Sequence, residues 1–170
     1  AACRKHSLGH YARDVHGGDG LGGASRAPGL RPTGEHAVDQ MLRLAAAHPG
    51  ELTLVAVGPL TNVATALQRD PSLVTAFRQV IVMGGAFRHP GNVTPHAEFN
   101  ISVDPEAAKI VFEAGFPLTV APLDATTQVL LDDEHLAGLG DGAVPDFVRA
   151  ITRDYLEWGL RRRGRRSAAM

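Results

Sequence analysis

Three short apolar segments separated by helical segments constrain the fold more than any other feature of this sequence. They are ELTLVAV at residues 51–57, VIVMGG at 80–85 and FPLTVAPLD at 116–124. Their β-branched and aliphatic residues are typical of strands, and the second segment is apolar enough to be buried on both faces of a sheet. Strands that alternate with helices predict a parallel sheet covered by helices. We therefore expect an α/β fold with a mostly parallel sheet.

Helical signals fill the gaps between these strands. Helices are expected at residues 34–50, 58–70, 71–79 and 104–115. The last of these is the best marked, because Asp104 can cap its start and Gly115 can end it. The first 34 residues are expected to be mostly loop, and the residues after 131 are expected to be helical.

Composition bounds the number of domains and the kinds of partner. A chain of 170 residues that is 44% hydrophobic is long enough to bury the core of one domain but short for two domains of ordinary size. The net charge of -1 gives no reason to expect a nucleic-acid or membrane partner. No apolar segment is long enough to cross a bilayer, and the first ten residues lack the apolar middle of a secretory signal. Cys3 is the single cysteine, which fits a reducing compartment, so we expect a cytoplasmic protein.

The loop after the second predicted strand has an unusual composition. It reads MGGAFRHPGNVTPHAEFN at residues 83–100 and places Asn92, Glu98 and Asn100 in close order. Ligands of open parallel sheets bind beyond the carboxyl ends of the strands, where this loop begins. Amides and a carboxylate together offer the donors and acceptors that sugar hydroxyls need, and Phe99 could form an apolar wall beside them or pack inward. Equally, the Asn and Glu side chains could satisfy the backbone of the loop itself.

Four segments, in order, resemble the signatures of the inosine–uridine nucleoside hydrolases. They are DVHGGDGLGG (14–23), LTLVAVGPLTNVATAL (52–67), GNVTPHAEFNISVDPEAAKIVF (91–112) and LDATTQVLL (123–131). The resemblance extends over roughly residues 14–160. It implies a Rossmann-like fold with a mostly parallel sheet flanked by helices. It also implies a glycosidase that hydrolyses the N-glycosidic bond of ribonucleosides to ribose and free base, with a bound Ca2+ ion.

The resemblance assigns substrate roles to residues of the 83–100 loop. Asn92 and Glu98 match the residues that hold the 5′-hydroxymethyl group of the nucleoside. Asn100 matches a residue that holds the lower edge of the ribose near the metal, and Met83 matches a residue that lines the sugar pocket. With Phe99 beside them, these side chains form the predicted substrate-binding set.

Two further residues receive roles only through the resemblance. Val57 matches the position whose main-chain carbonyl ligates calcium, a role that an apolar residue can fill because calcium accepts backbone oxygens. His16 matches a histidine that lies near the nucleobase in some members of the family, where it could position or protonate the leaving group, and it is the predicted catalytic residue. Without the resemblance, His16 reads more simply as a loop histidine that satisfies backbone groups. The reaction implied is metal-assisted hydrolysis, with calcium lowering the pKa of the attacking water.

The sequence departs from the family pattern at both ends. The family holds its calcium ion mainly with an aspartate cluster of the form D-x-D-x-x-x-D-D, which this sequence does not contain. Asp132-Asp133 lie after the third predicted strand instead, and the late His-Asp pair of the family is not reached before RRRGRRSAAM. We therefore expect a single partial nucleoside hydrolase domain over residues 1–170, truncated at both ends and lacking the family's first strand and general base.

Two functions consequently stay open. One is a nucleoside hydrolase of purine or pyrimidine salvage, a homo-oligomer when full length. The other is a catalytically inactive truncated remnant, or a sugar- or nucleoside-binding module, that lacks the metal aspartates. Base preference is also open, because many relatives carry histidine where this chain has Thr127. Asp124 could bind a ligand or cap the next segment, and the RRRGRR run at 161–166 could touch nucleic acid or form a frayed helix end.

Overall fold

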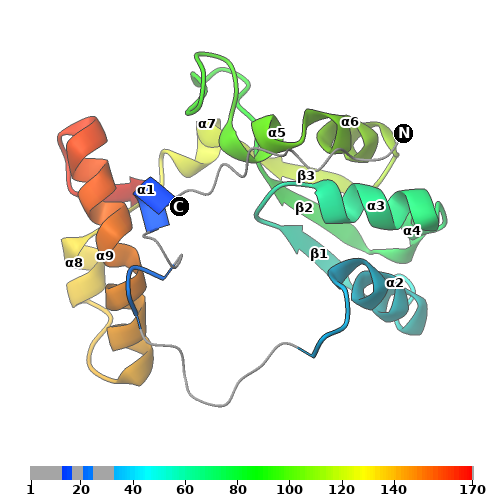
Figure 1. Cartoon of the computed structure of the whole chain (residues 1–170), viewed down its shortest axis with the longest axis horizontal. Coiled ribbons are helices and arrows are strands. Elements are labelled where there is room, and N and C mark those ends of the chain that lie inside the picture. Colours follow the sequence, from blue (N-terminus) through cyan, green and yellow to red (C-terminus); the bar gives the residue numbers. More distant parts are fainter. Residues whose placement is uncertain (1–12, 17–20, 25–32, 170) are drawn as a thin grey trace. The chain divides into compact units, whose positions relative to one another are not determined.

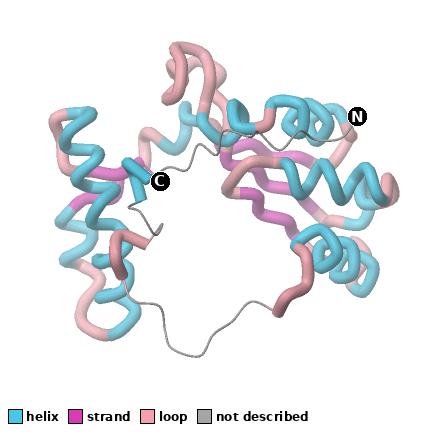
Figure 2. Tube along the Cα trace, viewed as in Figure 1, coloured by secondary structure: helices cyan, strands magenta, loops and turns pink. Residues whose placement is uncertain are grey.

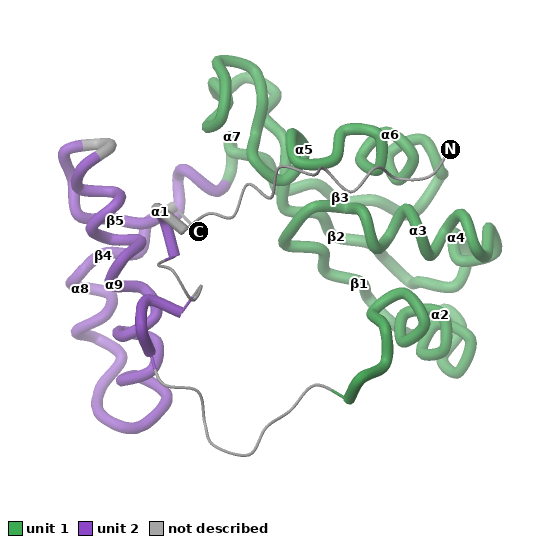
Figure 3. The backbone as a smooth tube through the Cα atoms, viewed as in Figure 1, with its two compact units in different colours: residues 1–9, 32–125 green, residues 10–31, 126–170 purple. Residues whose placement is uncertain are grey.

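The computed structural model describes residues 13–16, 21–24 and 33–169. The chain divides into two compact units, drawn in different colours in Figure 3. The first unit comprises residues 1–9 and 32–125, and the second comprises residues 10–31 and 126–170. Cys3 and most of the loop expected over the first 34 residues lie outside the described residues. That both units form a single partial domain stays a prediction.

A three-stranded parallel sheet organises the first unit. The strands are β1 (Thr53–Ala56), β2 (Gln79–Met83) and β3 (Leu118–Ala121), in the spatial order β1-β2-β3 (Figure 1). Val55 pairs with Ile81, and Ile81 pairs with Thr119, so the strands run in register with their carboxyl ends at one edge. The three predicted strands and their parallel arrangement are confirmed.

Six helices of the described chain accompany this sheet. They are α2 (Ala37–Ala47), α3 (Thr61–Arg69), α4 (Leu73–Ala76), α5 (Phe99–Val103), α6 (Pro105–Glu113) and α7 (Leu123–Thr126) (Figure 2). Four of them, α2, α3, α4 and α6, were predicted. The short helix α5 lies partly in the segment expected to be loop, and α7 occupies the end of the predicted third strand. Helices α5 and α7 have five and four residues, and a helix this short shows no apolar periodicity from which it could be predicted.

The core of the first unit lies against one face of β2. Val80 and Val82 have no exposed surface, while Ile81, on the other face, is half-buried. Helices α2, α3 and α6 supply Val38, Val63 and Val111 to the same cluster. The expectation that β2 is buried on both faces was therefore wrong. The fully buried residues of β2 are Val80 and Val82, which lie on one face of the strand.

Asp104 joins two of these helices. It is the N-cap of α6, where its Oδ1 accepts a hydrogen bond from the Ala107 N–H at 3.0 Å. Its Oδ2 accepts a second bond from the Thr61 hydroxyl of α3 at 2.6 Å. The side chain is buried, and these two donors compensate the cost of removing the carboxylate from water. The predicted cap is confirmed, and it also holds α3 against α6.

The second unit contains helices and a small antiparallel pair of strands. Its elements are α1 (Arg13–His16), β4 (Leu130–Asp132), α8 (Asp133–Ala137), α9 (Ala143–Arg163) and β5 (Ser167–Ala169). Leu131 pairs with Ala168, which packs with Leu136 and Leu156 in a separate core. The expectation that the residues after 131 are only helical was wrong at this strand pair.

A glycine explains why the basic run is not a frayed helix end. Gly164 ends α9 in the left-handed conformation, with φ of 68°, and its N–H bonds to the Leu160 carbonyl. The chain then turns into β5, and Arg166 forms ion pairs with Asp133 and Glu157.

Among the described residues, no helix is both long and apolar enough to cross a membrane.

Candidate functional site

Glu98 is the buried centre of the loop that follows β2. The side chain is 2% exposed, yet both of its oxygens have donors. Oε1 accepts from the Asn100 N–H at 3.0 Å, and Oε2 accepts from the N–H groups of Ile101 at 3.1 Å and Gly85 at 3.0 Å. Glu98 thus caps α5 and ties it to the end of β2. A carboxylate has about four acceptor positions, so these three donors leave one position on Oε1 unfilled.

Asn100 faces the last residue of β2. Its Nδ2 donates to the Met83 carbonyl at 3.1 Å and lies 3.2 Å from the Met83 Sδ. The side chain is 9% exposed, and its Oδ1 accepts no hydrogen bond from any residue in the described part of the chain. An amide oxygen can accept two hydrogen bonds, so a ligand hydroxyl could donate to this one.

Asn92 binds the backbone at the end of the same loop. Its Oδ1 accepts from the Phe99 N–H at 2.8 Å, and its own backbone N–H donates to the Ala97 carbonyl at 3.1 Å. The residue is exposed, so its Nδ2 group can reach a ligand, while Phe99 is half-buried. Asn92, Glu98 and Asn100 therefore meet at one place, because the first two bind the backbone of residues 99–101 and the third projects from it.

Gly91 permits this close fold, and sequence reasoning assigned it no role. A Cβ atom there would lie 2.3 Å from the Thr94 carbonyl oxygen and 2.4 Å from the backbone of Ala97. No side chain fits such a gap, so the turn that presents Asn92 requires glycine. The Pro-Gly-Asn sequence at 90–92 was the available signal, since this pattern marks a tight turn.

Asp124 also contacts this loop, 37 residues away in sequence. Its Oδ2 accepts from the Phe87 N–H at 2.8 Å, and its Oδ1 accepts from the N–H groups of Arg88 at 2.7 Å and His89 at 3.0 Å. These donors, with the Phe87 bond the largest contribution, hold the pKa of the Asp124 carboxyl below its usual range. Asp124 therefore fastens the loop to the end of β3, which neither sequence alternative described.

The described residues provide little for a metal. Val57 follows β1 directly and lies at the same end of the sheet as Met83, because Ala56 pairs with Val82. Within the described ranges no group of three or more His, Cys, Asp or Glu could hold a metal ion. Calcium takes six to eight oxygen ligands, so the Val57 carbonyl and its described surroundings do not by themselves fit calcium.

His16 belongs to the second unit. It is exposed at the end of α1, and its ring centroid lies 5.3 Å from that of Tyr155 on α9. Tyr155 in turn lies 5.9 Å from the Trp158 ring. The remaining predicted residues, from Val57 to Asn100, all belong to the first unit.

Comparison with known proteins agrees with the loop signature. Residues 2–170 match the family described as inosine-uridine preferring nucleoside hydrolase. Probable uridine nucleosidase 1 of Oryza sativa subsp. japonica is 43% identical over 147 residues, which is 85% of this chain and 45% of that protein. Uridine nucleosidase 1 of Arabidopsis thaliana is 38% identical over 163 residues, which is 94% of this chain and 48% of that protein.

Two solved structures are similar over most of the chain. A plant nucleoside hydrolase superposes with a TM-score of 0.88 at 34% identity, covering 95% of this chain and 52% of that one. A purine-preferring ribonucleoside hydrolase from Gardnerella vaginalis gives a TM-score of 0.85 at 31% identity, covering 90% and 49%. The chain spans about half the length of the relatives it matches. On the match over residues 2–170, the chain belongs to the inosine-uridine preferring nucleoside hydrolase family.

Proposed function

We propose that this protein hydrolyses the N-glycosidic bond of ribonucleosides, releasing ribose and a free base. Membership of a family of enzymes supports the proposal. The observation that carries it for this chain is the convergence of Glu98 and Asn100 at the end of β2, each with acceptor capacity left over. A hydroxyl-rich ligand can use that capacity.

Each residue of the loop has a proposed role in holding the ribose. The open position on Oε1 of Glu98 accepts the 5′-hydroxyl proton, and Nδ2 of Asn92 donates to the same hydroxyl oxygen. Oδ1 of Asn100 accepts from a hydroxyl at the lower edge of the ring, while Met83 and Phe99 line the pocket. Fixing the sugar at several points favours the orientation in which water reaches the anomeric carbon in line.

The proposal also covers the group that acts on the leaving base and the metal ion. His16 is proposed to position or protonate the leaving base. The family is generally metal-dependent, and calcium is the metal we propose, with the Val57 carbonyl as one ligand. The described residues do not complete a calcium site, so the roles proposed for this chain's residues are to bind and orient the substrate and, for His16, to act on the leaving base.

A second function is favoured by the same metal observation. Because the described residues hold no cluster of metal ligands, a catalytically inactive nucleoside-binding module is the alternative. Cytoplasmic location, a role in salvage, homo-oligomeric assembly and the lack of nucleic-acid or membrane partners stay predictions.

The test uses the three asparagines of the chain, Asn62, Asn92 and Asn100. Ribose, uridine and inosine are titrated into chain labelled with 15N at asparagine, and the side-chain amide signals are followed by NMR. We expect all three ligands to shift the Asn92 and Asn100 signals, since ribose is common to them, and to leave Asn62 of α3 unchanged. Equal responses of the three asparagines, or none at millimolar ligand, would refute the ribose site.

A further inference from the structure

We propose that Asp124 is a positioning residue of the ribose site, which holds the loop at residues 86–97 in the geometry that presents Asn92. The role rests on the proposed function, because it concerns the loop through which ribose is bound. Asp124 acts through the loop backbone and is not itself a ligand for the substrate.

Three consecutive N–H groups converge on the Asp124 carboxylate. They belong to Phe87, Arg88 and His89, at distances of 2.8, 2.7 and 3.0 Å. Successive backbone N–H groups of this kind form a concave anion site, which in other proteins receives a phosphate or another bound anion. Here a side chain of the same chain fills the concavity. The neighbouring Leu123 N–H donates to the Gly85 carbonyl at 2.9 Å, so the chain after β3 grips the loop at two adjacent points.

The loop depends on such bonds because it has no apolar anchor. Residues 87–90 and 92–96 are exposed, and none of them belongs to the hydrophobic core. At its far end the loop is held by the Asn92 and Glu98 side chains. At its near end Asp124 supplies the side-chain contacts, and hydrogen bonds to an ionised carboxylate are about twice as strong as neutral ones. The position of Asn92 therefore depends on both ends.

Asp124→Asn tests the role with little change of shape, because an amide keeps one acceptor oxygen and replaces the other by a donor. One or two of the three N–H groups then lose their acceptor, and the remaining bonds lose the charge. Asp70→Asn is the matched control: Asp70 is an exposed carboxylate of the same unit, and its Oδ1 accepts from the N–H and hydroxyl of Ser72, outside the loop.

Two readouts separate the possible outcomes. Without ligand, we expect hydrogen exchange of the Phe87–His89 amides to become about tenfold faster in Asp124→Asn, and not in Asp70→Asn. With ribose or uridine, we expect the dissociation constant measured at the Asn100 signal to rise about tenfold. The free energy of unfolding of the first unit should fall no further in Asp124→Asn than in Asp70→Asn. If Asp124 only stabilised the fold, this free energy would fall further than in the control.

Other results would overturn the proposal. Unchanged exchange at residues 87–89 would show that Asp124 does not hold the loop, whatever happens to binding. Faster exchange with an unchanged ribose affinity would show that the contact has no positioning role. If the wild-type chain binds neither ribose nor uridine, the proposed function fails and the positioning role fails with it, while the exchange result still reports on the contact. Should Asp124→Asn not fold, the amide proton shifts of Phe87 and Arg88 in wild type must titrate together with the Asp124 carboxyl, and failure to follow that carboxyl would refute the contact.

Discussion

Replacing Glu98 with Gln tests the most buried charge of the site. The two side chains have the same shape, but one oxygen becomes an NH2 group. The least costly rotamer places the amide oxygen at the Oε2 position, where it keeps the N–H groups of Gly85 and Ile101. The NH2 group then faces the Asn100 N–H, so a buried donor loses its acceptor.

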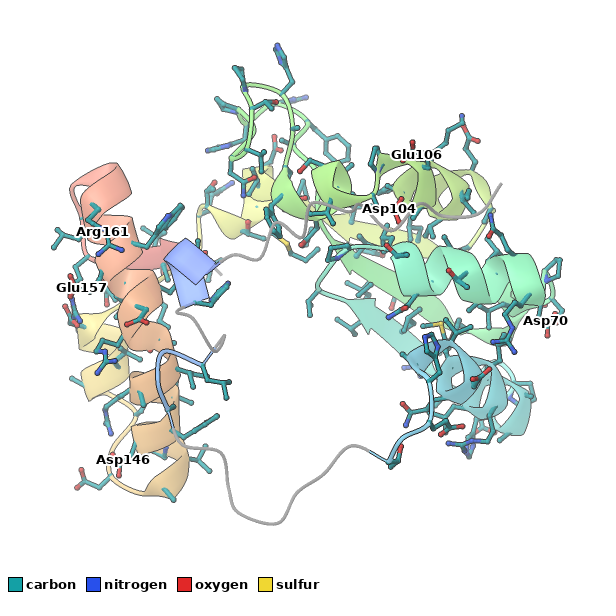
Figure 4. The ribbon with its side chains drawn as sticks, viewed as in Figure 1. Asp70, Asp104, Glu106, Asp146, Glu157 and Arg161 are labelled. Atoms are coloured by element: carbon teal, nitrogen blue, oxygen red, sulfur yellow. The ribbon has the colours of Figure 1, made fainter. Side chains whose placement is uncertain are left out.

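The expected cost follows from these three bonds. An unsatisfied buried N–H costs about 1–3 kcal/mol, and two charge-assisted bonds that become neutral lose about 1 kcal/mol each. The neutral amide is easier to bury than the carboxylate, which offsets part of the sum. We expect the free energy of unfolding of the first unit to fall by roughly 2–4 kcal/mol. Glu106→Gln is the control, because Glu106 is exposed in the first turn of α6 (Figure 4).

The assay must report on the first unit. The single tryptophan, Trp158, lies in the second unit, so its fluorescence does not serve. Methyl NMR signals of the core residues Val80 and Val82, followed through a urea titration, report the unit directly. A Glu98→Gln variant as stable as Glu106→Gln would refute the view that Glu98 holds β2 and α5 together.

Four further outcomes are expected. Asp104→Ala should lower the stability of the first unit by about 2–4 kcal/mol, measured by the same methyl signals, because it removes the α6 cap and the acceptor for Thr61. Gly91→Ala should weaken ribose binding in the NMR titration while leaving the core signals in place, since the added Cβ forces the turn open. The pKa of Asp124 is lowered on folding, so its contribution to the stability of the first unit should be complete above the unfolded-state pKa and be lost only as pH falls through the lower folded value; Phe87 and Arg88 amide shifts that follow the loss of this carboxylate only near neutral pH would contradict this. The 170-residue chain should release little or no ribose from inosine or uridine, and calcium-dependent turnover would disprove that.

Local sequence signals predicted much of the first unit. Apolar runs located β1, β2 and β3, and the Asp104 cap located α6, because these features lie within one element. The strand pair β4–β5 escaped prediction since its strands have three residues each and Leu130 pairs with Ala169, far along the chain. No period can be read from three residues, and no local pattern announces a partner at that distance.

For the candidate site, too, the sequence predicted the local features and not the long-range contacts. The sequence located Asn92, Glu98 and Asn100 in one loop, and the structure brings them to one place. Their ligand roles stay predictions. The sequence could not show that Glu98 takes three backbone donors, because one of them belongs to Gly85, 13 residues away. The Asp124 contact was hidden for the same reason, as it joins the loop after β2 to α7, 37 residues further along the chain.

The position of Glu98 has a consequence for how the site can move. Its carboxylate bonds to Gly85 at the end of β2 and to Asn100 and Ile101 of α5, so α5 cannot detach without abandoning a buried charge. The amides of these three residues should therefore exchange with solvent only when the entire first unit opens, whereas those of the exposed tip at 92–96 exchange through small fluctuations. The groups around Glu98 therefore keep their places unless the whole first unit opens.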